Sequence, residues 1–252
     1  MRIFALSDIH IDYQENRDWL FDLSSMDFKE DILILAGDVT DSLKLLRQCF
    51  LKLSAIFRKV LYIPGNHDLW IVRERFLSSF EKYDRICDIA GDCDILMTPY
   101  HLRTLSIVPL LGWYDFSFGS PNAQLIDTWM DFRNCDWSEQ LNLRAVCAFF
   151  LEKNTDALKT INRTVISFSH FMPRLDLIPN FVPASWHYLN PVMGSTLIEA
   201  QIRRLRPQIH IFGHRHFNCQ THIDGILYIN NAFGYPCEQS ITNKKLLCIF
   251  NL

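Results

Sequence analysis

The sequence predicts an α/β fold in which β-sheets pack between helices as one sandwich. Two observations predict it. In the first third of the chain, short apolar segments alternate with segments of helical periodicity, which is the pattern of βαβ units around a largely parallel sheet. Near the C-terminus, the apolar segments 225–230 and 245–250 follow one another as antiparallel strands do. The length suits a single domain over residues 1–252.

The elements of the first third follow from apolar runs and periodicity. Short apolar runs predict strands at 2–7, 31–37 and 59–65. Helices are predicted between and after them, at 14–24, 41–57 and 69–83. The helical signal is clearest in the second of these, where apolar residues recur every three or four positions: Leu43, Leu46, Phe50, Leu53 and Phe57.

The rest of the chain is less regular. Residues 94–111 predict two or three short strands, and the aromatic-rich segment 112–137 predicts an irregular one. Ser138, followed by Glu139, is expected to open a helix over 138–160. Residues 171–193 contain four prolines and predict a long loop. Strands are expected at 163–170 and 208–214, and a helix at 195–205.

Composition excludes several classes of protein. Hydrophobic residues make up 49% of the chain and charged residues 21%, which predicts a sizeable core and argues against disorder. The net charge of −3 carries no basic signature of a nucleic-acid partner. The eight cysteines form no CxxC pair and are expected to be reduced thiols. No apolar stretch approaches the length of a membrane span, and we expect a cytoplasmic location.

Polar side chains follow five of the expected strands. Because ligands in open α/β sheets bind beyond the carboxyl ends of the strands, these side chains are expected to share one region. Glycines stand beside several of them, where the backbone must turn sharply or pass close to a bound group. The set comprises Asp8, His10, Asp38, Asn66, His170, His214 and His216.

The composition of this set predicts two metal ions. Asp8 and His10, like His214 and His216, are two residues apart, so in a nearly extended chain their side chains leave on the same side. Seven donors are too many for a tetrahedral structural zinc and suit two ions bridged by one carboxylate. Imidazole, carboxylate and amide oxygen together favour Mn, Fe, Zn, Co or Ni over Ca or Mg.

The ordered motifs D-x-H, G-D, G-N-H-D, H and G-H-x-H resemble those of the calcineurin-like metallophosphoesterase family. The resemblance runs from Asp8 to His216. It implies a four-layer αββα sandwich with two mixed sheets, and a dinuclear site with two divalent or trivalent transition-metal ions. By position, Asp8, His10 and His216 would hold one ion, and Asn66, His170 and His214 the other. Asp38 would bridge both.

The same resemblance implies a phosphoester hydrolase, with phosphomonoesters and phosphodiesters both open. A metal-bridging hydroxide would attack phosphorus in line, and His67 would face the substrate and protonate the leaving group. Asp41 or Asp68 would hold the tautomer of His67. Asp68 is also expected to support the turn that carries Asn66 and His67.

Substrate contacts are expected from the two rim segments, 112–137 and 171–193. The aromatic cluster of the first, which includes Trp113 and Trp129, forms either a small core under a long loop or a wall for an apolar substrate group. Arg133 and Arg174 are candidates for a phosphate oxygen, and His187 with Trp186 for a pocket. Arg215 is expected to face away from the metals, because it alternates with His214 and His216.

Two other functions stay open. Some proteins of this fold have lost their ligands and act as non-catalytic scaffolds or binding modules, and others are nucleases. Here every ligand position and His67 hold competent side chains, which favours the enzyme, and the charge balance argues against a nuclease. The aromatic rim and compact size favour a small phosphoester substrate. The sequence does not predict the oligomeric state.

Overall fold

The computed structural model describes residues 1–74, 78–137, 142–159 and 162–252. Its first sheet has five strands in the order β11-β1-β2-β3-β4. The neighbours from β1 to β4 pair in parallel, and β11 pairs antiparallel with β1. The strands are β1 (Arg2–Leu6), β2 (Ile32–Leu35), β3 (Lys59–Tyr62), β4 (Ile95–Leu96) and β11 (Leu247–Asn251).

The second sheet has six strands in the order β5-β6-β7-β8-β10-β9. Its inner strands are parallel, and the two edge strands pair antiparallel with their neighbours. The strands are β5 (Tyr100–His101), β6 (Leu105–Pro109), β7 (Thr164–Phe168), β8 (Ile209–Phe212), β9 (Cys219–Ile223) and β10 (Ile226–Asn230).

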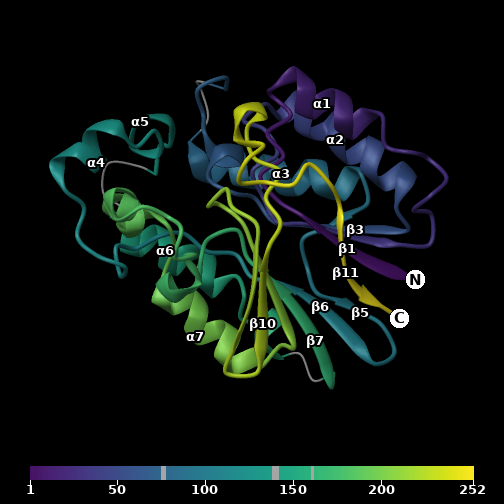
Figure 1. Cartoon of the computed structure of the whole chain (residues 1–252). Coiled ribbons are helices and arrows are strands. Elements are labelled where there is room, and N and C mark those ends of the chain that lie inside the picture. The colour runs from purple at the N-terminus through teal and green to yellow at the C-terminus, as the bar shows by residue number, and fades with distance from the viewer. Residues whose placement is uncertain (75–77, 138–141, 160–161) are drawn as a thin grey trace.

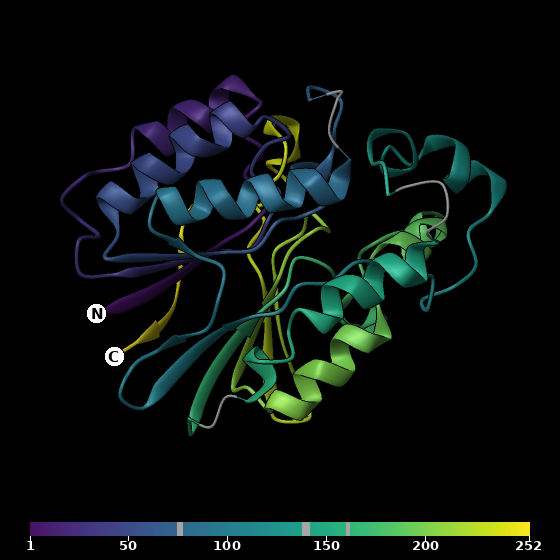
Figure 2. The same ribbon diagram turned by 180° about the vertical axis from the view of Figure 1, so that it is seen from behind.

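Helices cover the outer faces of both sheets. The first sheet is covered by α1 (Gln14–Phe21), α2 (Leu43–Ile56) and α3 (Ser79–Asp92), and the second by α6 (Leu143–Glu152) and α7 (Thr196–Leu205) (Figures 1 and 2). The two sheets therefore form the middle layers, and the predicted αββα sandwich with two mixed sheets is confirmed. Every residue of β2 is fully buried, as expected for a strand covered on both faces.

The apolar residues of α2 recur at helical spacing because they form the buried face of this helix. Its buried residues include Leu46, Phe50 and Leu53, which face the sheet. The side chain of Ser42 caps the helix by accepting a hydrogen bond from the backbone N–H of Leu45. The helix predicted over 41–57 is therefore confirmed, with its ends at Leu43 and Ile56.

Two predicted helices are shifted. The one expected at 69–83 is α3, which starts only at Ser79, because Ser78 and Glu81 form a capping box immediately before it. The one expected at 138–160 is α6, where Asn142 caps the helix through the N–H of Ala145. Ser138 and Glu139 lie outside the described residues.

The two segments expected to be irregular contain short helices. Segment 112–137 includes α4 (Ala123–Thr128) and α5 (Asp131–Asn134), which lie to the side of the sandwich in Figure 1. Segment 171–193 includes two 3₁₀ helices, Leu175–Leu177 and Ala184–Val192. None of the described helices is long and apolar enough to cross a membrane.

The C-terminal strands are each antiparallel to a neighbour, as predicted, although they do not pair with each other. Strand β10 pairs antiparallel with β9 and in parallel with β8, while β11 crosses to the first sheet and pairs antiparallel with β1. The segment between them follows the end of β1: the backbone of Ser7 bonds to Asn231 and Phe233, and Gly234 donates to the carbonyl of Asp8. This crossing segment joins the two sheets at the edge where their parallel strands end.

Candidate dinuclear metal centre

The seven predicted donors converge at the carboxyl ends of β1, β2, β3, β7 and β8. The first three of these strands belong to one sheet and the other two to its partner. Six of the seven residues are buried. The most open is His216, whose side chain is 11% exposed. The site therefore lies where the two sheets meet.

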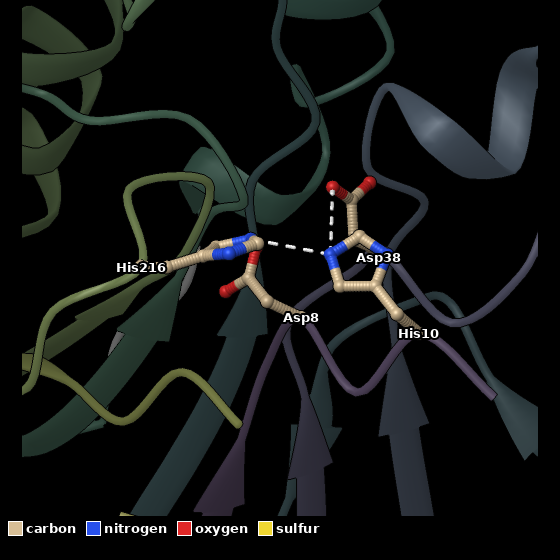
Figure 3. Close-up of side chains that lie close together, drawn as sticks. All are labelled: Asp8, His10, Asp38 and His216. Carbon is tan, nitrogen blue, oxygen red and sulfur yellow. Dashed lines mark hydrogen bonds and ion pairs between the residues drawn. The ribbon is translucent and has the colours of Figure 1, made fainter. Parts of the chain in front are cut away.

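One group of donors comprises Asp8, His10, Asp38 and His216 (Figure 3). Its candidate ligand atoms all lie within 4.8 Å of one another. The Nε2 atoms of His10 and His216 are 3.1 Å apart, and His216 Nε2 is 3.5 Å from Asp8 Oδ1. His10 Nε2 lies 3.9 Å from Asp38 Oδ2.

A second group comprises Asp38, His170 and His214, again within 4.8 Å. Asn66 joins it, because its Oδ1 lies 2.8 Å from His214 Nδ1 and 3.1 Å from His170 Nε2. His170 Nε2 is 3.5 Å from Asp38 Oδ1. The two groups share Asp38, which presents one oxygen to each.

The backbone is strained at this site. Asp8, His10, Asp38 and His214 have φ values of 54°, 44°, 54° and 71°. Residues with side chains rarely adopt this left-handed conformation, and such strain concentrates at functional sites. The expectation of a nearly extended chain at Asp8 and His10 was therefore wrong: left-handed turns, and not strand alternation, aim these side chains.

Gly65 shows how closely the backbone approaches the site. A Cβ atom added there would lie 2.1 Å from Asp38 Oδ1 and 2.6 Å from His170 Cε1. Any larger residue would displace a donor of the candidate centre. The glycine of the G-N-H-D motif is thus required by the lack of space for a side chain.

Outer hydrogen bonds fix which atom each donor presents. The carbonyl oxygens of Ala36 and Val192 accept from His170 Nδ1 and His214 Nε2, and Glu238 accepts from His216 Nδ1. A carbonyl or carboxylate oxygen can only accept, so the opposite nitrogen of each neutral ring carries a lone pair. In His170 and His214 these lone pairs face the site, and His216 turns its Nε2 toward Asp8 and His10.

The resulting arrangement fits metal ions. Around Asn66 Oδ1, the facing atoms of His170 and His214 are acceptors only 2.8–3.2 Å apart, with no hydrogen between them. Acceptors at this distance repel unless a cation lies among them. Imidazole, carboxylate and amide oxygens are suitable ligands for transition metals, so the residues present fit two such ions.

Burial and neighbouring charges shift the pKa values of the donors. Burial raises the pKa of Asp38 well above its ordinary value, and the nearby Asp8 and Asp68 raise it further. Burial lowers the pKa of His10 and His214, and neighbouring histidines add to this. For His216, bonds to Asp8 and Glu238 outweigh burial and raise the pKa to about 9.

His67 lies beside the donors. Its ring stacks on Trp70 with centroids 3.7 Å apart, and its Nε2 is 3.4 Å from the hydroxyl of Tyr235. Its backbone N–H donates to Asp38 Oδ1 at 2.9 Å. Burial, together with His216 and His170, lowers the pKa of His67 to about 3, so its ring is neutral at pH 7.

The structure does not bring Asp41 or Asp68 to the ring of His67. The Asp41 carboxylate pairs with Arg73 Nε at 2.6 Å. Asp68 instead accepts four backbone N–H groups, at 2.8–2.9 Å, from residues 38–40 and 65. Asp68 thus supports the turn, as expected, whereas Trp70 and Tyr235 contact the ring.

Asp131 is a buried carboxylate that the sequence analysis missed. It accepts from Asn66 Nδ2 at 2.8 Å, from the indoles of Trp70 and Trp129 at 2.6 and 2.8 Å, and from the Tyr114 hydroxyl at 3.1 Å. Nothing in the sequence marks it, because it follows no strand and belongs to no motif. It orients the Asn66 amide so that Oδ1 faces the centre.

A cavity of about 480 Å³ opens onto the centre. It reaches donors from both groups and is bounded mainly by apolar and aromatic side chains of the two expected rim segments and the C-terminal region. Those of the rim segments are Trp129, Phe181, Val182, Pro183, Trp186, Leu189 and Met193. Those of the C-terminal region are Phe217, Tyr235 and Ile241.

Two candidates for substrate contacts, Trp129 and Trp186, line this cavity. Four others do not: Trp113, Arg133, Arg174 and His187. Trp113 is fully buried against Tyr114, Trp137 and Phe171, so it belongs to a core. Arg133 bonds to Asp127, and His187 is exposed.

Arg174 pairs with Asp176 and Glu199. The side chain of Arg215 contacts Asn190 and Phe217 and none of the seven donors, which agrees with its predicted direction away from the metals. It nevertheless lines the cavity. These placements depend on packing between distant segments, which spacing does not reveal.

Comparisons with known proteins agree with this site. The family model of the calcineurin-like phosphoesterases matches residues 1–218. The uncharacterized protein L509 of Acanthamoeba polyphaga mimivirus is 24% identical over 267 residues, which cover 96% of this chain and 95% of that protein. The [acyl-carrier-protein] phosphodiesterase PptH of Mycobacterium tuberculosis is 31% identical over 128 residues, covering 46% of this chain and 38% of that protein.

The crystal structure of the phosphopantetheinyl hydrolase PptH from Mycobacterium tuberculosis is similar in fold. It superimposes with a TM-score of 0.77 at 22% sequence identity, over 95% of this chain and 91% of that one. The family match spans every motif from Asp8 to His216. This chain therefore belongs to the calcineurin-like phosphoesterase family and is a phosphoric ester hydrolase.

Proposed function

We propose that the protein is a dinuclear metal-dependent phosphodiesterase that acts on a small substrate with an apolar organic group. The observation that carries the proposal is the pair of donor groups that share Asp38. Asp8, His10 and His216 would hold one ion, Asn66, His170 and His214 the other, and Asp38 both. Bound there, Mn, Fe, Zn, Ni or Co ions would polarise a phosphoryl oxygen and lower the pKa of water.

His67 is placed to assist the leaving group. Its ring lines the cavity next to the donors, and Trp70 and Tyr235 hold its plane. The neutral ring can donate its N–H to the leaving oxygen. An anionic phosphoester beside it favours the protonated form of the ring, which can then supply a proton.

The cavity supports a diester with an apolar group. Among the described residues that line it, Arg215 is the one lysine or arginine. Most of the remaining wall is apolar or aromatic. A phosphodiester carries a second organic group that such a wall can bury. The relative PptH is named as a phosphodiesterase of acyl-carrier protein, and this name also favours a diester.

A substrate panel tests the proposal. Protein stripped of metal by chelation is reloaded with Mn, Fe, Zn, Ni or Co and given p-nitrophenyl phosphate, bis(p-nitrophenyl) phosphate, cyclic nucleotides and acyl-carrier protein bearing phosphopantetheine. We expect metal-dependent hydrolysis, with a higher kcat/KM for diesters than for the monoester. Faster hydrolysis of the monoester would contradict the diester assignment, and no metal-dependent turnover of any substrate would contradict the function.

The shared ligand is tested by Asp38→Asn. We expect loss of both ions, measured as metal per protein, because each group loses its common carboxylate. Asp115→Asn is the matched control. Asp115 is also buried, and its carboxylate accepts a hydrogen bond from the backbone N–H of Ser117. Retention of one ion by Asp38→Asn would show that Asp38 does not bridge.

A further inference from the structure

Arg215 is a buried cation in the wall of the active-site cavity. It lies between His214 and His216 in the chain, and only 7% of its surface is exposed. Its guanidinium carbon is 5.8 Å from the ring centroid of Phe217, and Nη1 is 3.5 Å from Asn190 Oδ1, at the limit for a hydrogen bond. The guanidinium thus lies against the apolar part of the cavity.

This guanidinium lacks the partners that a buried charge needs. Its Nη2 is buried and has no hydrogen-bond partner among the described residues, and none of their carboxylates forms an ion pair with it. Glu238 lines the same cavity, but its Oε2 bonds to His216 and to the backbone N–H of Tyr235. Burying a cation without a partner is strongly unfavourable.

Two other cations of the protein, Lys82 and Arg174, are compensated. Lys82 is fully buried, yet its ammonium bonds to the carbonyls of Asp41 and Trp70 and lies 3.4 Å from Glu74 Oε2. Arg174 pairs with Asp176 and Glu199. The comparison indicates that Arg215 is completed by something other than the described protein groups.

We propose that Arg215 binds a second anionic group of the substrate, a carboxylate or a phosphate, separate from the phosphoester that is hydrolysed. This inference rests on the proposed function. Guanidinium recognises both anions through paired N–H donors. A second anion is favoured over the scissile phosphate because Arg215 contacts Asn190 and Phe217 and none of the seven donors.

The substrate class that follows is a phosphodiester with an apolar body and a distal negative charge. The apolar body would lie on Trp129, Trp186 and Met193, which line the same cavity. The distal charge would occupy the place of the missing partner of Arg215. Without that charge, binding would leave the guanidinium unpaired and desolvated.

Paired substrates test this specificity. Phenyl p-nitrophenyl phosphate is compared with derivatives that carry a carboxylate or a phosphate on the phenyl ring, using the metal-loaded protein. We expect kcat/KM to be roughly 10- to 100-fold higher for at least one anionic derivative, the range of a charge-assisted hydrogen bond. Arg215→Met should remove this preference and Arg215→Lys should keep part of it.

The readout is the ratio of two substrates on one protein, so a loss of folded protein cancels. Arg133→Met is the matched control, because Arg133 is exposed and does not line the cavity. Equal kcat/KM for all substrates in the wild type, a preference that survives Arg215→Met, or an equal loss of all substrates in the variants would overturn the proposal. Failure of the proposed function differs from these outcomes, since no diester would then be hydrolysed by the wild type.

A binding measurement keeps the test independent of turnover. Benzoate and the uncharged benzamide are added to the metal-free protein, in which a carboxylate finds no metal ion to bind. We expect benzoate to raise Tm more than benzamide does in the wild type and in Arg133→Met, but not in Arg215→Met. An equal effect of the two compounds on the wild type would count against an anion site at Arg215.

Discussion

Asn66 illustrates how a single side chain is divided between two tasks. Its Oδ1 faces the rings of His170 and His214, and its Nδ2 donates to Asp131. An amide presents an acceptor at one end and a donor at the other, so the bond to Asp131 decides which end faces the candidate metal. Asp131 is therefore a positioning residue that acts through Asn66.

Asp131→Asn is expected to weaken one metal site selectively. The new amide can donate to Asn66 as well as accept from it, so the Asn66 amide is free to turn its Nδ2 toward the metal. We expect about 10- to 100-fold weaker binding of one ion, with the Asp8 side retained, measured by metal titration of each site. Asp115→Asn is the control. Unchanged affinity of both ions in Asp131→Asn would contradict the positioning role.

His67→Ala is expected to separate metal binding from turnover. The ring contacts Trp70 and Tyr235 and is not among the proposed ligands, so metal content should stay at the wild-type level. The kcat should fall by about 10²- to 10⁴-fold, the usual contribution of a positioned acid or base. The exposed His187→Ala provides the control. Full turnover by metal-loaded His67→Ala would remove this residue from the mechanism.

At the level of elements, the start of the first sheet is held by an ion pair. Asp31, immediately before β2, accepts from the backbone N–H of Arg2 at 2.7 Å and from its guanidinium at 2.6 and 3.0 Å. Arg2 is the first residue of β1. These bonds fix the parallel register of β1 and β2, whose far ends carry Asp8 and Asp38.

The Asp31 pair predicts a pH-dependent contribution to stability. Burial opposes the charge of Asp31, but the bonds from Arg2 outweigh it, and its pKa is lowered from 3.8. The stabilisation is therefore complete above pH 3.8 and is lost as the pH falls through the lower pKa of the folded state.

Urea unfolding measures this contribution. Asp31→Asn should lose about 1 kcal/mol at pH 7, since Arg2 is half exposed, and the difference should shrink below pH 3.8. Asp88→Asn, in which an exposed carboxyl is replaced, is the control. A difference between wild type and Asp31→Asn that grows on acidification would contradict the assignment.

At the level of the whole molecule, the candidate centre links the two sheets. Asp8, Asp38 and Asn66 follow strands of the first sheet, whereas His170 and His214 follow strands of the second. Ions bound at their facing lone pairs would hold the sheets together and relieve repulsion between acceptors. Folding stability and metal occupancy should therefore be coupled.

Chelation is expected to destabilise the whole protein. With metal at 100 times its Kd, binding contributes about 2.7 kcal/mol per ion, which corresponds to a Tm change of roughly 5–10 °C for a chain of this size. Scanning calorimetry with and without chelator measures the change. The Tm of Asp38→Asn, which should bind neither ion, should not respond to chelator. An unchanged Tm of the wild type would show that the centre is not metal-coupled.

The extent of prediction differs between the features of this molecule. Short apolar runs located β1, β2 and β3 well, because burial on both faces of a parallel sheet leaves a local signal. The start of α3 and the sheet of β11 were missed, since a capping box overrode the periodicity and strand pairing is a long-range property. Arg133, Arg174, Trp113 and His187 were placed at the cavity by their position in rim segments, and each lies elsewhere.

The sequence by itself determined the fold class, the family and the set of seven donors, because residue type and spacing at strand ends are local properties that motifs retain. Only the tertiary structure decided how those donors are aimed. The left-handed backbone at Asp8, His10, Asp38 and His214 replaced the expected extended geometry. It also revealed Asp131 behind Asn66 and the unpaired guanidinium of Arg215, since hydrogen bonding and burial arise between segments far apart in the chain.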